Sequence, residues 1–248
     1  MRRSAPTLLA SGESVLVAIH QPHYLPWLGY LHRMAQADLF IVLDHVQFER
    51  GNYQNRTQLR VNGAPHWLTV PVAQRSQKER IVEKTIDAAQ GWAATHFETL
   101  RRAYGGAASA PLKSIYETPW ERLADLNAAL LEFLREAFAI RTPLVNSSEL
   151  DVGGAKSELV LNLCKAVGAD ALLVGLGGSR HYLDRTAFAQ SGVELVFQEF
   201  NHPVYPQRGP APFIAGLSAV DLLFNLGPDS RSVLLGHATE DELSVATA

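Results

Sequence analysis

The sequence has little cysteine, little lysine and no long apolar run. Its one cysteine, Cys164, can form neither an internal disulfide nor a thiolate metal cluster. No apolar run approaches the roughly 18–20 residues that a membrane-spanning helix needs. The apolar stretch at 7–10 makes a poor signal peptide, because Ser11, Gly12 and Glu13 interrupt it. We therefore expect a cytoplasmic protein without a membrane span or a metal site.

The small net charge excludes a further class of protein. A formal charge of −3 at pH 7 does not suit a general nucleic-acid binder, so no nucleic-acid partner is expected. Of the 22 lysines and arginines, 17 are arginines, whose planar fork suits phosphates and carboxylates. Genome composition is the commoner cause of such a bias, so the arginines only hint at an anionic ligand.

The length and apolar content are those of a globular protein. With 248 residues, of which 47% are hydrophobic and 19% charged, the chain can form one large domain. We expect this single α/β domain over 14–237, with flexible ends at 1–13 and 238–248.

The order of elements predicts the fold class. Apolar runs typical of strands buried on both faces occur at 15–19, 39–43 and 171–175, and the last strand is expected at 193–200. A further strand is expected at 66–72, after a polar segment at 45–65. A short helix is expected between the first two strands, and further helices are expected at 92–104, 120–139, 159–167 and 218–225. The sequence thus predicts an α/β fold with a mostly parallel, Rossmann-like sheet flanked by helices and a helical insertion at about 90–140.

Polar residues gather at the expected strand ends. His20, Gln21 and His23 follow the first strand, Asp44 and Gln47 follow the second, and Gly177, Gly178 and Arg180 follow a later one. Because ligands of open parallel sheets bind outside the carboxyl ends of the strands, we expect these residues to line one pocket. A histidine there can act in general acid–base catalysis, and the glycines can present amides to an anion. The alternatives are that each histidine only bonds the loop backbone and that Asp44 caps a turn.

A rigid loop follows the last expected strand. His202, Tyr205 and Gln207 would reach the same edge, with Pro203 and Pro206 fixing their directions. The rival interpretation, that Tyr205 fills the core and His202 caps a strand, is almost as well supported. Cys164 lies on the apolar stripe of its helix, which favours a buried structural thiol over a nucleophile.

Several separated motifs carry a resemblance to a known family. They are IHQPHYLPWLGYLHRMAQADLFIVLDHVQF at 19–48, NRTQLR at 55–60, WLTVPV at 67–72, GLGGSRHYLD at 175–184, FQEFNHPVYPQ at 197–207 and LSAVDLLFNLG at 217–227. In this order they resemble the WbqC-like protein family over about 17–236. The resemblance adds Tyr24, Asn55, Arg56, Tyr182 and Asp184 to the substrate-binding candidates. The chain departs from the family pattern at 175–176, where a Ser-Gly-Pro type start is commoner, and at His181, a commonly acidic position.

The family resemblance implies a biosynthetic role for the protein. Such proteins belong to the synthesis of surface polysaccharides or natural products and are described loosely as transferases. We therefore expect acyl or aminoacyl transfer to an amine of a sugar or amino-acid-like substrate, small or carrier-bound, without a cofactor. His20 or His23 would be the base, Asp44 its orienter, and Asn55 or the Gly177 and Gly178 amides the oxyanion donors.

Two alternative functions stay open at this point. One is an enzyme similar to the HIGH-type nucleotidyltransferases, although the histidine spacing differs from theirs. The other is a non-catalytic ligand-binding subunit that uses the same pocket. A homodimer is compatible with either function and with the transferase.

Overall fold

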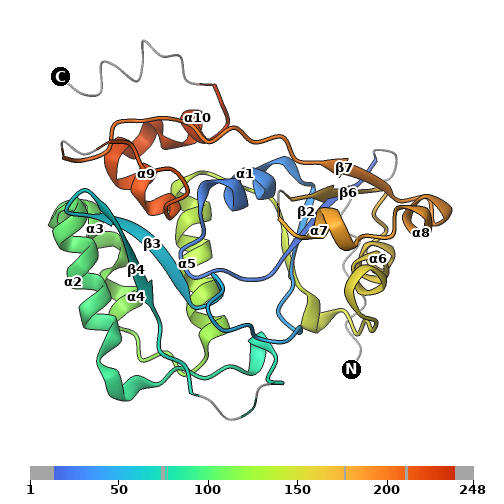
Figure 1. Ribbon diagram of the computed structural model, residues 1–248, viewed down its shortest axis with the longest axis horizontal. Coiled ribbons are helices and arrows are strands. Elements are labelled where there is room, and N and C mark those ends of the chain that lie inside the picture. Colours follow the sequence, from blue (N-terminus) through green and yellow to red (C-terminus); the bar gives the residue numbers. More distant parts are fainter. Residues whose placement is uncertain (1–13, 74–75, 77, 176, 210–211, 238–248) are drawn as a thin grey trace. The chain divides into compact units, whose positions relative to one another are not determined.

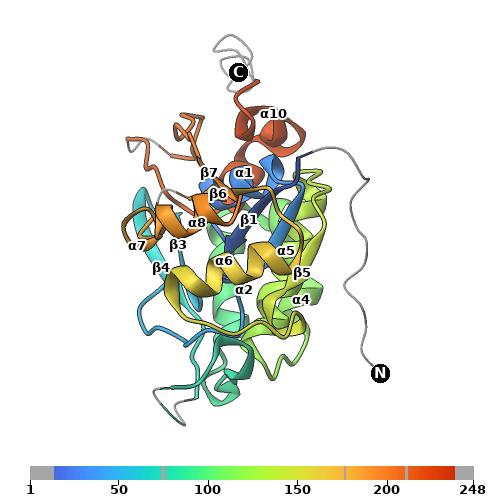
Figure 2. The ribbon, with the colours of Figure 1, turned by 90° about the vertical axis from the view of Figure 1, so that its right-hand side faces the viewer.

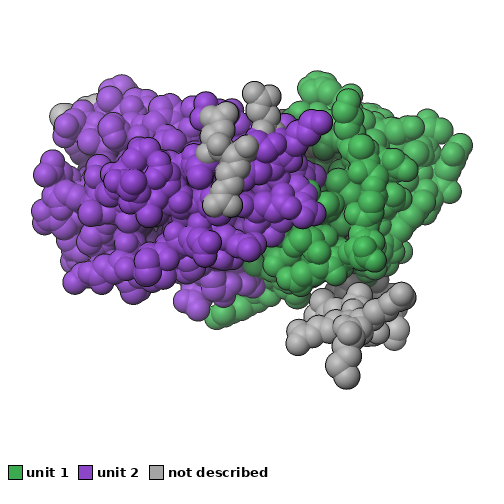
Figure 3. Space-filling model, turned by 90° about the horizontal axis from the view of Figure 1, so that it is seen from below, with its two compact units in different colours: residues 1–21, 33–45, 141–200 green, residues 22–32, 46–140, 201–248 purple. Residues whose placement is uncertain are grey.

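The chain forms two compact units, which we describe separately. The computed structural model describes residues 14–73, 76, 78–175, 177–209 and 212–237 (Figure 1). Unit 1 comprises 1–21, 33–45 and 141–200, and unit 2 comprises 22–32, 46–140 and 201–248 (Figure 3). The single domain expected over 14–237 stays a prediction, and the ends expected to be flexible lie outside the described residues.

Unit 1 is built on a five-stranded parallel sheet. The strand order is β5 (Leu144–Asn146), β2 (Leu39–Val42), β1 (Leu16–His20), β6 (Ala171–Val174) and β7 (Glu194–Phe197). Every neighbouring pair in this sheet is parallel. All residues of β2 and β6 are buried, as expected of apolar strands covered on both faces. The predicted α/β fold with a parallel sheet flanked by helices is confirmed.

Helices pack around this sheet. Unit 1 contains α6 (Lys156–Ala166), α7 (Ser179–Tyr182), α8 (Arg185–Gln190) and the 3-10 turn η4 (Ser147–Glu149). In Figure 2, α6 lies in front of β1. Cys164 on α6 is fully buried, and burial raises the pKa of its thiol to about 12, so it is protonated at neutral pH. Helix α1 (Leu28–Gln36) starts in unit 2 and ends in unit 1.

Unit 2 combines a β-hairpin with helices. Strands β3 (Arg56–Val61) and β4 (Ala64–Thr69) are antiparallel. Their two-residue turn has positive φ at Asn62 and Gly63, the conformation that twists correctly into a tight hairpin. The expected strand at 66–72 is therefore β4, which starts and ends earlier. Strand β3 lies in the polar segment at 45–65, where no strand was expected.

The helices of unit 2 provide its core. They are α2 (Trp92–Tyr104), α3 (Gly106–Ser109), α4 (Lys113–Glu117), α5 (Leu123–Ala137), α9 (Ala219–Leu226) and α10 (Ser230–Leu234), with 3-10 turns η1 (Ile81–Glu83), η2 (Ala88–Gln90), η3 (Ala110–Leu112) and η5 (Gly227–Asp229). Helix α2 packs against β3 (Figure 1). The leucines of α5 form much of the core, and Leu126, Leu130 and Leu134 are fully buried. No helix in the described part of the chain is both long and apolar enough to cross a membrane.

Candidate functional site

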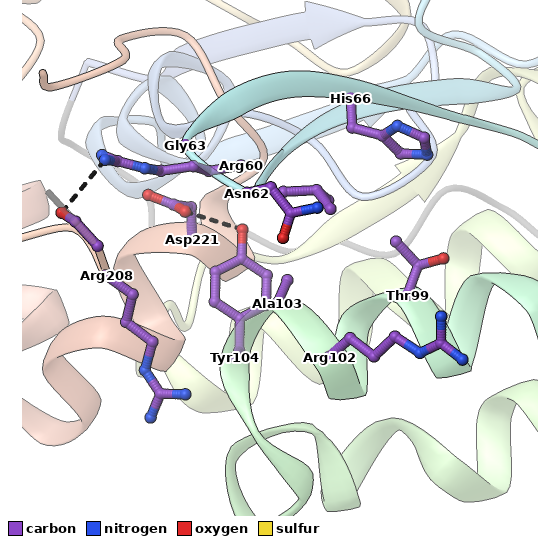
Figure 4. Close-up of a pocket in the computed structure, with 12 residues that line it drawn as sticks. Arg60, Asn62, Gly63, His66, Thr99, Arg102, Ala103, Tyr104, Arg208 and Asp221 are labelled. Carbon is purple, nitrogen blue, oxygen red and sulfur yellow. Dashed lines mark hydrogen bonds between the residues drawn. The ribbon is translucent and has the colours of Figure 1, made fainter. Parts of the chain in front are cut away.

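A pocket in unit 2 has the size of a small-molecule site. Its volume is about 570 Å³, within the roughly 300–1,000 Å³ typical of ligand pockets. We call it the arginine pocket (Figure 4). Its lining comes from the end of the hairpin, from α2, from α9 and from the loop before α9, and consists of Arg60, Val61, Asn62, Gly63, His66, Thr99, Arg102, Ala103, Tyr104, Arg208, Gly209 and Asp221.

A buried carboxylate lies at one end of the arginine pocket. Asp221 has no exposed surface and accepts three hydrogen bonds of 2.8 Å each, from Tyr104 Oη, Tyr205 Oη and Gln207 Nε2. Burial raises the pKa of Asp221 above its ordinary value, although these donors and Arg60 act in the opposite direction. The three donors satisfy a carboxylate that would otherwise be costly to bury.

Arg60 provides a positive charge whose position is fixed. The side chain is buried, Nη1 donates to Gln207 Oε1 at 2.7 Å, and Nη2 donates to the Gly209 carbonyl at 3.4 Å. Gln207 is itself held by the backbone of Ile214, because its amide donates to the carbonyl and accepts from the N–H, each at 2.9 Å. One side chain thus links the Arg60 guanidinium to the Asp221 carboxylate.

Two further arginines line the pocket from its exposed side. Arg102 on α2 binds Glu98 through Nε at 2.7 Å. Arg208 is exposed, and its guanidinium makes no ion pair within the described part of the chain. Arg60 and Asp221 lie at one end of the pocket, while His66, Thr99 and Arg102 lie at the other (Figure 4). Three guanidinium groups against one satisfied carboxylate make the lining positive, which suits an anionic ligand.

Two of the predicted site residues bind the buried carboxylate of this pocket without lining it. Tyr205 and Gln207 both donate to Asp221, and the predicted sharing of one site with the residues after β1, β2 and β6 stays a prediction. Tyr205 is 4% exposed and does not line the pocket, so it has the core position of the rival interpretation. His202 donates from Nδ1 to the Pro203 carbonyl at 2.8 Å and accepts from the Gly216 N–H at Nε2 at 3.1 Å. Burial lowers the pKa of His202, which favours this neutral form.

The residues after β1 belong to different units. The His20 Nδ1 atom lies 2.8 Å from the Gln21 carbonyl within unit 1. His23, in unit 2, is buried with its ring 5.3 Å from that of Tyr30 and 5.5 Å from that of Tyr53. The proposed roles of His20, Gln21 and His23 in a ligand site stay predictions.

Tyr24 occupies the core of unit 2. It is fully buried, and its hydroxyl lies 2.8 Å from His96 Nδ1 and 2.5 Å from Tyr116 Oη. Burial lowers the pKa of His96 to about 4, so the imidazole is neutral at pH 7. This arrangement gives Tyr24 a structural position, and contact with substrate stays a prediction.

Asp44 joins the ends of two neighbouring strands. Its carboxylate accepts from Ser147 Oγ at 3.0 Å, from the Ser148 N–H at 2.9 Å and from Ser148 Oγ at 2.7 Å. The two serines follow β5, so the carboxylate fixes the chain next to β2 at the carboxyl edge of the sheet. This is close to the capping role that was the alternative for Asp44, and its part in orienting a histidine stays a prediction.

The other two candidates near the hairpin differ in their surroundings. Asn55 is buried and donates from Nδ2 to the Val70 carbonyl at 2.8 Å. Arg56 lies with its guanidinium carbon 4.2 Å from the centroid of the Trp67 ring. Gln47 lines a separate pocket of about 400 Å³ in the same unit, beside Phe48 and Lys84.

The buried guanidinium of Arg33 lies close to the start of the glycine loop after β6. A Cβ atom at Gly175 would lie 1.6 Å from Arg33 Nη1, so the glycine leaves room for this buried guanidinium. Gly177 and Gly178 are exposed, and Tyr182 is 45% exposed. Asp184 caps α8 by accepting from the Thr186 and Ala187 N–H groups. The side chain of Arg180 lies outside what the structure describes, and anion binding by this loop stays a prediction.

Sequence reasoning missed the residues that define the arginine pocket, including Arg60, Tyr104 and Asp221. One signal was available for Asp221, which stands in the apolar helix sequence LSAVDLLFNLG. An acidic residue is rarely fully buried unless it is paired. Among the described residues, no group of three or more His, Cys, Asp and Glu side chains could hold a metal ion.

Comparisons with known proteins identify the family of the chain. The parallel sheet and the pocket define an α/β protein with a cavity of small-molecule size. The chain belongs to the WbqC-like protein family, whose model matches residues 21–233. It is also 29% identical over 225 residues to an uncharacterized protein of Mycobacterium tuberculosis, an alignment that covers 88% of this chain and 96% of the relative. No solved structure matches the chain closely enough to count as similar.

Proposed function

We propose that the protein is a group-transfer enzyme whose substrate carries a phosphate or a carboxylate, and that the arginine pocket binds this anion. The charge balance of the pocket carries the proposal, since its lining holds three arginines, of which Arg102 also pairs with Glu98, and one carboxylate that is already satisfied within the protein. A guanidinium fork matches both anions. Because Arg60 is held by Gln207 and Gly209, its ordering costs little when a ligand arrives.

The proposed reaction is acyl or aminoacyl transfer from a thioester to an amine of the bound substrate. The amine nitrogen forms a bond to the carbonyl carbon, and the bond from this carbon to sulfur breaks. The proton that the nitrogen loses passes to His66 and then to the leaving thiolate. His66 is the proposed base because it lines the pocket and is exposed, whereas all three donors around Asp221 occupy that carboxylate.

The proposed biological setting comes from the family resemblance. We place the reaction in the synthesis of a surface polysaccharide or a natural product in the cytoplasm, with a small or carrier-bound substrate. The proposed reaction requires neither a second copy of the chain nor a carrier protein.

A second candidate is a non-catalytic subunit that binds the same anionic ligand. The observation that favours it is that Asp221, the one carboxylate of the pocket lining, is fully engaged and unsuited to act as a base. His66 is therefore the residue whose substitution distinguishes the two functions.

Binding of glucose 1-phosphate, measured by calorimetry, tests the anion site. The Arg102→Gln/Arg208→Gln double variant should weaken binding at least about tenfold, or ~1.4 kcal/mol. The matched control is Arg101→Gln, because Arg101 neighbours Arg102, also binds Glu98 and does not line the pocket. It should bind within about twofold of the unaltered protein. Equal binding by the double variant and the unaltered protein would refute the anion site.

Product formation separates the two candidate functions. Purified protein is incubated with amino sugar phosphates and coenzyme A thioesters, and products are detected by mass spectrometry. If the protein is the proposed enzyme, His66→Gln should lower turnover at least about 10²-fold while glucose 1-phosphate binding is retained. Binding without any product would favour the non-catalytic subunit.

A further inference from the structure

A second cluster of ligand-type side chains lies on the hairpin of unit 2, outside the arginine pocket. Arg56 pairs with Thr69 and Trp67 pairs with Gln58 in the β3–β4 register, so Arg56 and Trp67 are diagonal neighbours on one face of the hairpin. This places the Arg56 guanidinium carbon 4.2 Å from the centre of the Trp67 ring. The guanidinium is also close to the turn before β3, since a Cβ at Gly51 would lie 3.8 Å from Nη2.

The charge of Arg56 has no ion-pair partner within the described residues. Its guanidinium makes no ion pair there, and its Nε is buried without a hydrogen-bond partner. A half-buried guanidinium usually forms charge-assisted hydrogen bonds, which are the strong ones. The stacked ring holds the planar group in place but does not satisfy its N–H donors.

Two exposed aromatic rings belong to this cluster, Trp67 beside the guanidinium and Tyr53 beside Trp67. Tyr53 is 37% exposed and Trp67 is 38% exposed, and both stand among the few large apolar side chains of the described chain that reach solvent. Their ring centres are 5.6 Å apart and their planes are inclined by 49°. Tyr53 is in turn stacked on His23, with ring centres 5.5 Å apart, so its position is fixed.

We propose that Tyr53, Arg56 and Trp67 form a binding site for an acidic saccharide, a sugar ring that carries a carboxylate or a phosphate. Arg56 would pair with the anionic group, and the two rings would contact the C–H groups of the sugar. The inclination of 49° argues against a planar nucleobase, which can lie parallel to only one of the two rings. A saturated ring presents C–H bonds in several directions and can contact both.

This site is independent of the proposed function. None of its three residues lines the arginine pocket. Arg56 and Arg60 are four residues apart on β3, which corresponds to roughly 13 Å along a strand. The acidic saccharide site can therefore be tested with the arginine pocket disabled.

The indole N–H signal of Trp67 in an ¹⁵N NMR spectrum reports on the site directly. The protein has 4 tryptophans, and the signal that Trp67→Phe removes is that of Trp67. Titration with glucuronic acid or glucose 1-phosphate should shift this signal saturably, with a Kd at least about tenfold below that of glucose. The Arg102→Gln/Arg208→Gln double variant should give the same shift, which separates this site from the arginine pocket.

Arg56→Gln is the decisive variant, and it should weaken binding of either acid at least about tenfold. Arg185→Gln is the matched control, because Arg185 also stacks on an aromatic ring, 5.1 Å from the centre of Phe197, but lies in unit 1. Arg56→Lys keeps the positive charge and is the control for a folding defect. It should still bind both acids, but more weakly than the unaltered protein.

Four results would overturn the proposal. They are the absence of a shift of the Trp67 signal with either acid, equal binding by Arg56→Gln and the unaltered protein, inorganic phosphate binding as tightly as glucose 1-phosphate, and AMP binding more tightly than both acids. The third result would mean that the aromatic rings contribute nothing, and the fourth would point to a nucleotide. A larger response to glucuronic acid than to glucose 1-phosphate would identify a carboxylate as the preferred group, and the reverse would identify a phosphate.

Discussion

Substitution of Tyr205 distinguishes a structural role of this residue from a role in ligand binding. Tyr205→Phe removes one of the three donors to Asp221 and leaves the ring in the core. A hydrogen bond to a buried charged group contributes about 1.5–3 kcal/mol, so the free energy of unfolding should fall by this amount. Because Tyr205 does not line the arginine pocket, the affinity for glucose 1-phosphate should change less than about twofold.

Urea unfolding and calorimetry on the same preparations measure both effects. Tyr104→Phe should destabilise the fold similarly, and the double variant should be non-additive because both hydroxyls bind one carboxylate. The control is Tyr182→Phe, which alters a half-exposed side chain and should cost less than about 0.5 kcal/mol. The reasoning is refuted if Tyr205→Phe is as stable as this control, or if it loses affinity without losing stability.

Two further predictions concern acid stability and the glycine loop. The pKa of His96 is lowered by burial from 6.5 to about 4, so between these values the unfolded chain takes up a proton that the folded chain does not. The free energy of unfolding should therefore fall by about 3 kcal/mol as the pH falls from 6.5 to 4. Urea titrations measure this dependence on pH. It should be weaker for His96→Gln than for the control His237→Gln, which removes an exposed imidazole. Gly175→Ala should destabilise unit 1 by about 1–3 kcal/mol, because its Cβ would displace the buried guanidinium of Arg33. Gly177→Ala, where a Cβ would contact nothing, should be neutral in thermal unfolding, and equal melting of the two variants would contradict the close approach.

The parallel sheet could be predicted because its strands carry their signal locally. The strands β2 and β6 are apolar throughout and β1 is apolar up to His20 at its end, and burial on both faces requires such a composition. The hairpin strand β3 was missed because it carries a polar side chain at every second position, including Arg60, which is buried despite its charge. A short strand such as β5, with three residues, has too little sequence to stand out.

The site was predicted less completely than the sheet, for a physical reason. Arg60 is held by Gln207, 147 residues further along the chain, and Tyr104 donates to Asp221, 117 residues away. Such pairings depend on tertiary packing and leave no local pattern. Tyr205 and Gln207 were singled out because two prolines and adjacent polar residues mark their loop, although the pattern did not distinguish a core position from a ligand contact.

The most direct test of the anion-binding arginine pocket is a crystal structure of the protein soaked with glucose 1-phosphate at a saturating concentration. The account predicts that phosphate oxygens lie within about 2.7–3.2 Å of guanidinium nitrogens of the arginine pocket, with Arg208 drawn toward the ligand. An empty arginine pocket, with the phosphate bound only at the glycine loop of unit 1 or at Arg56, would contradict it.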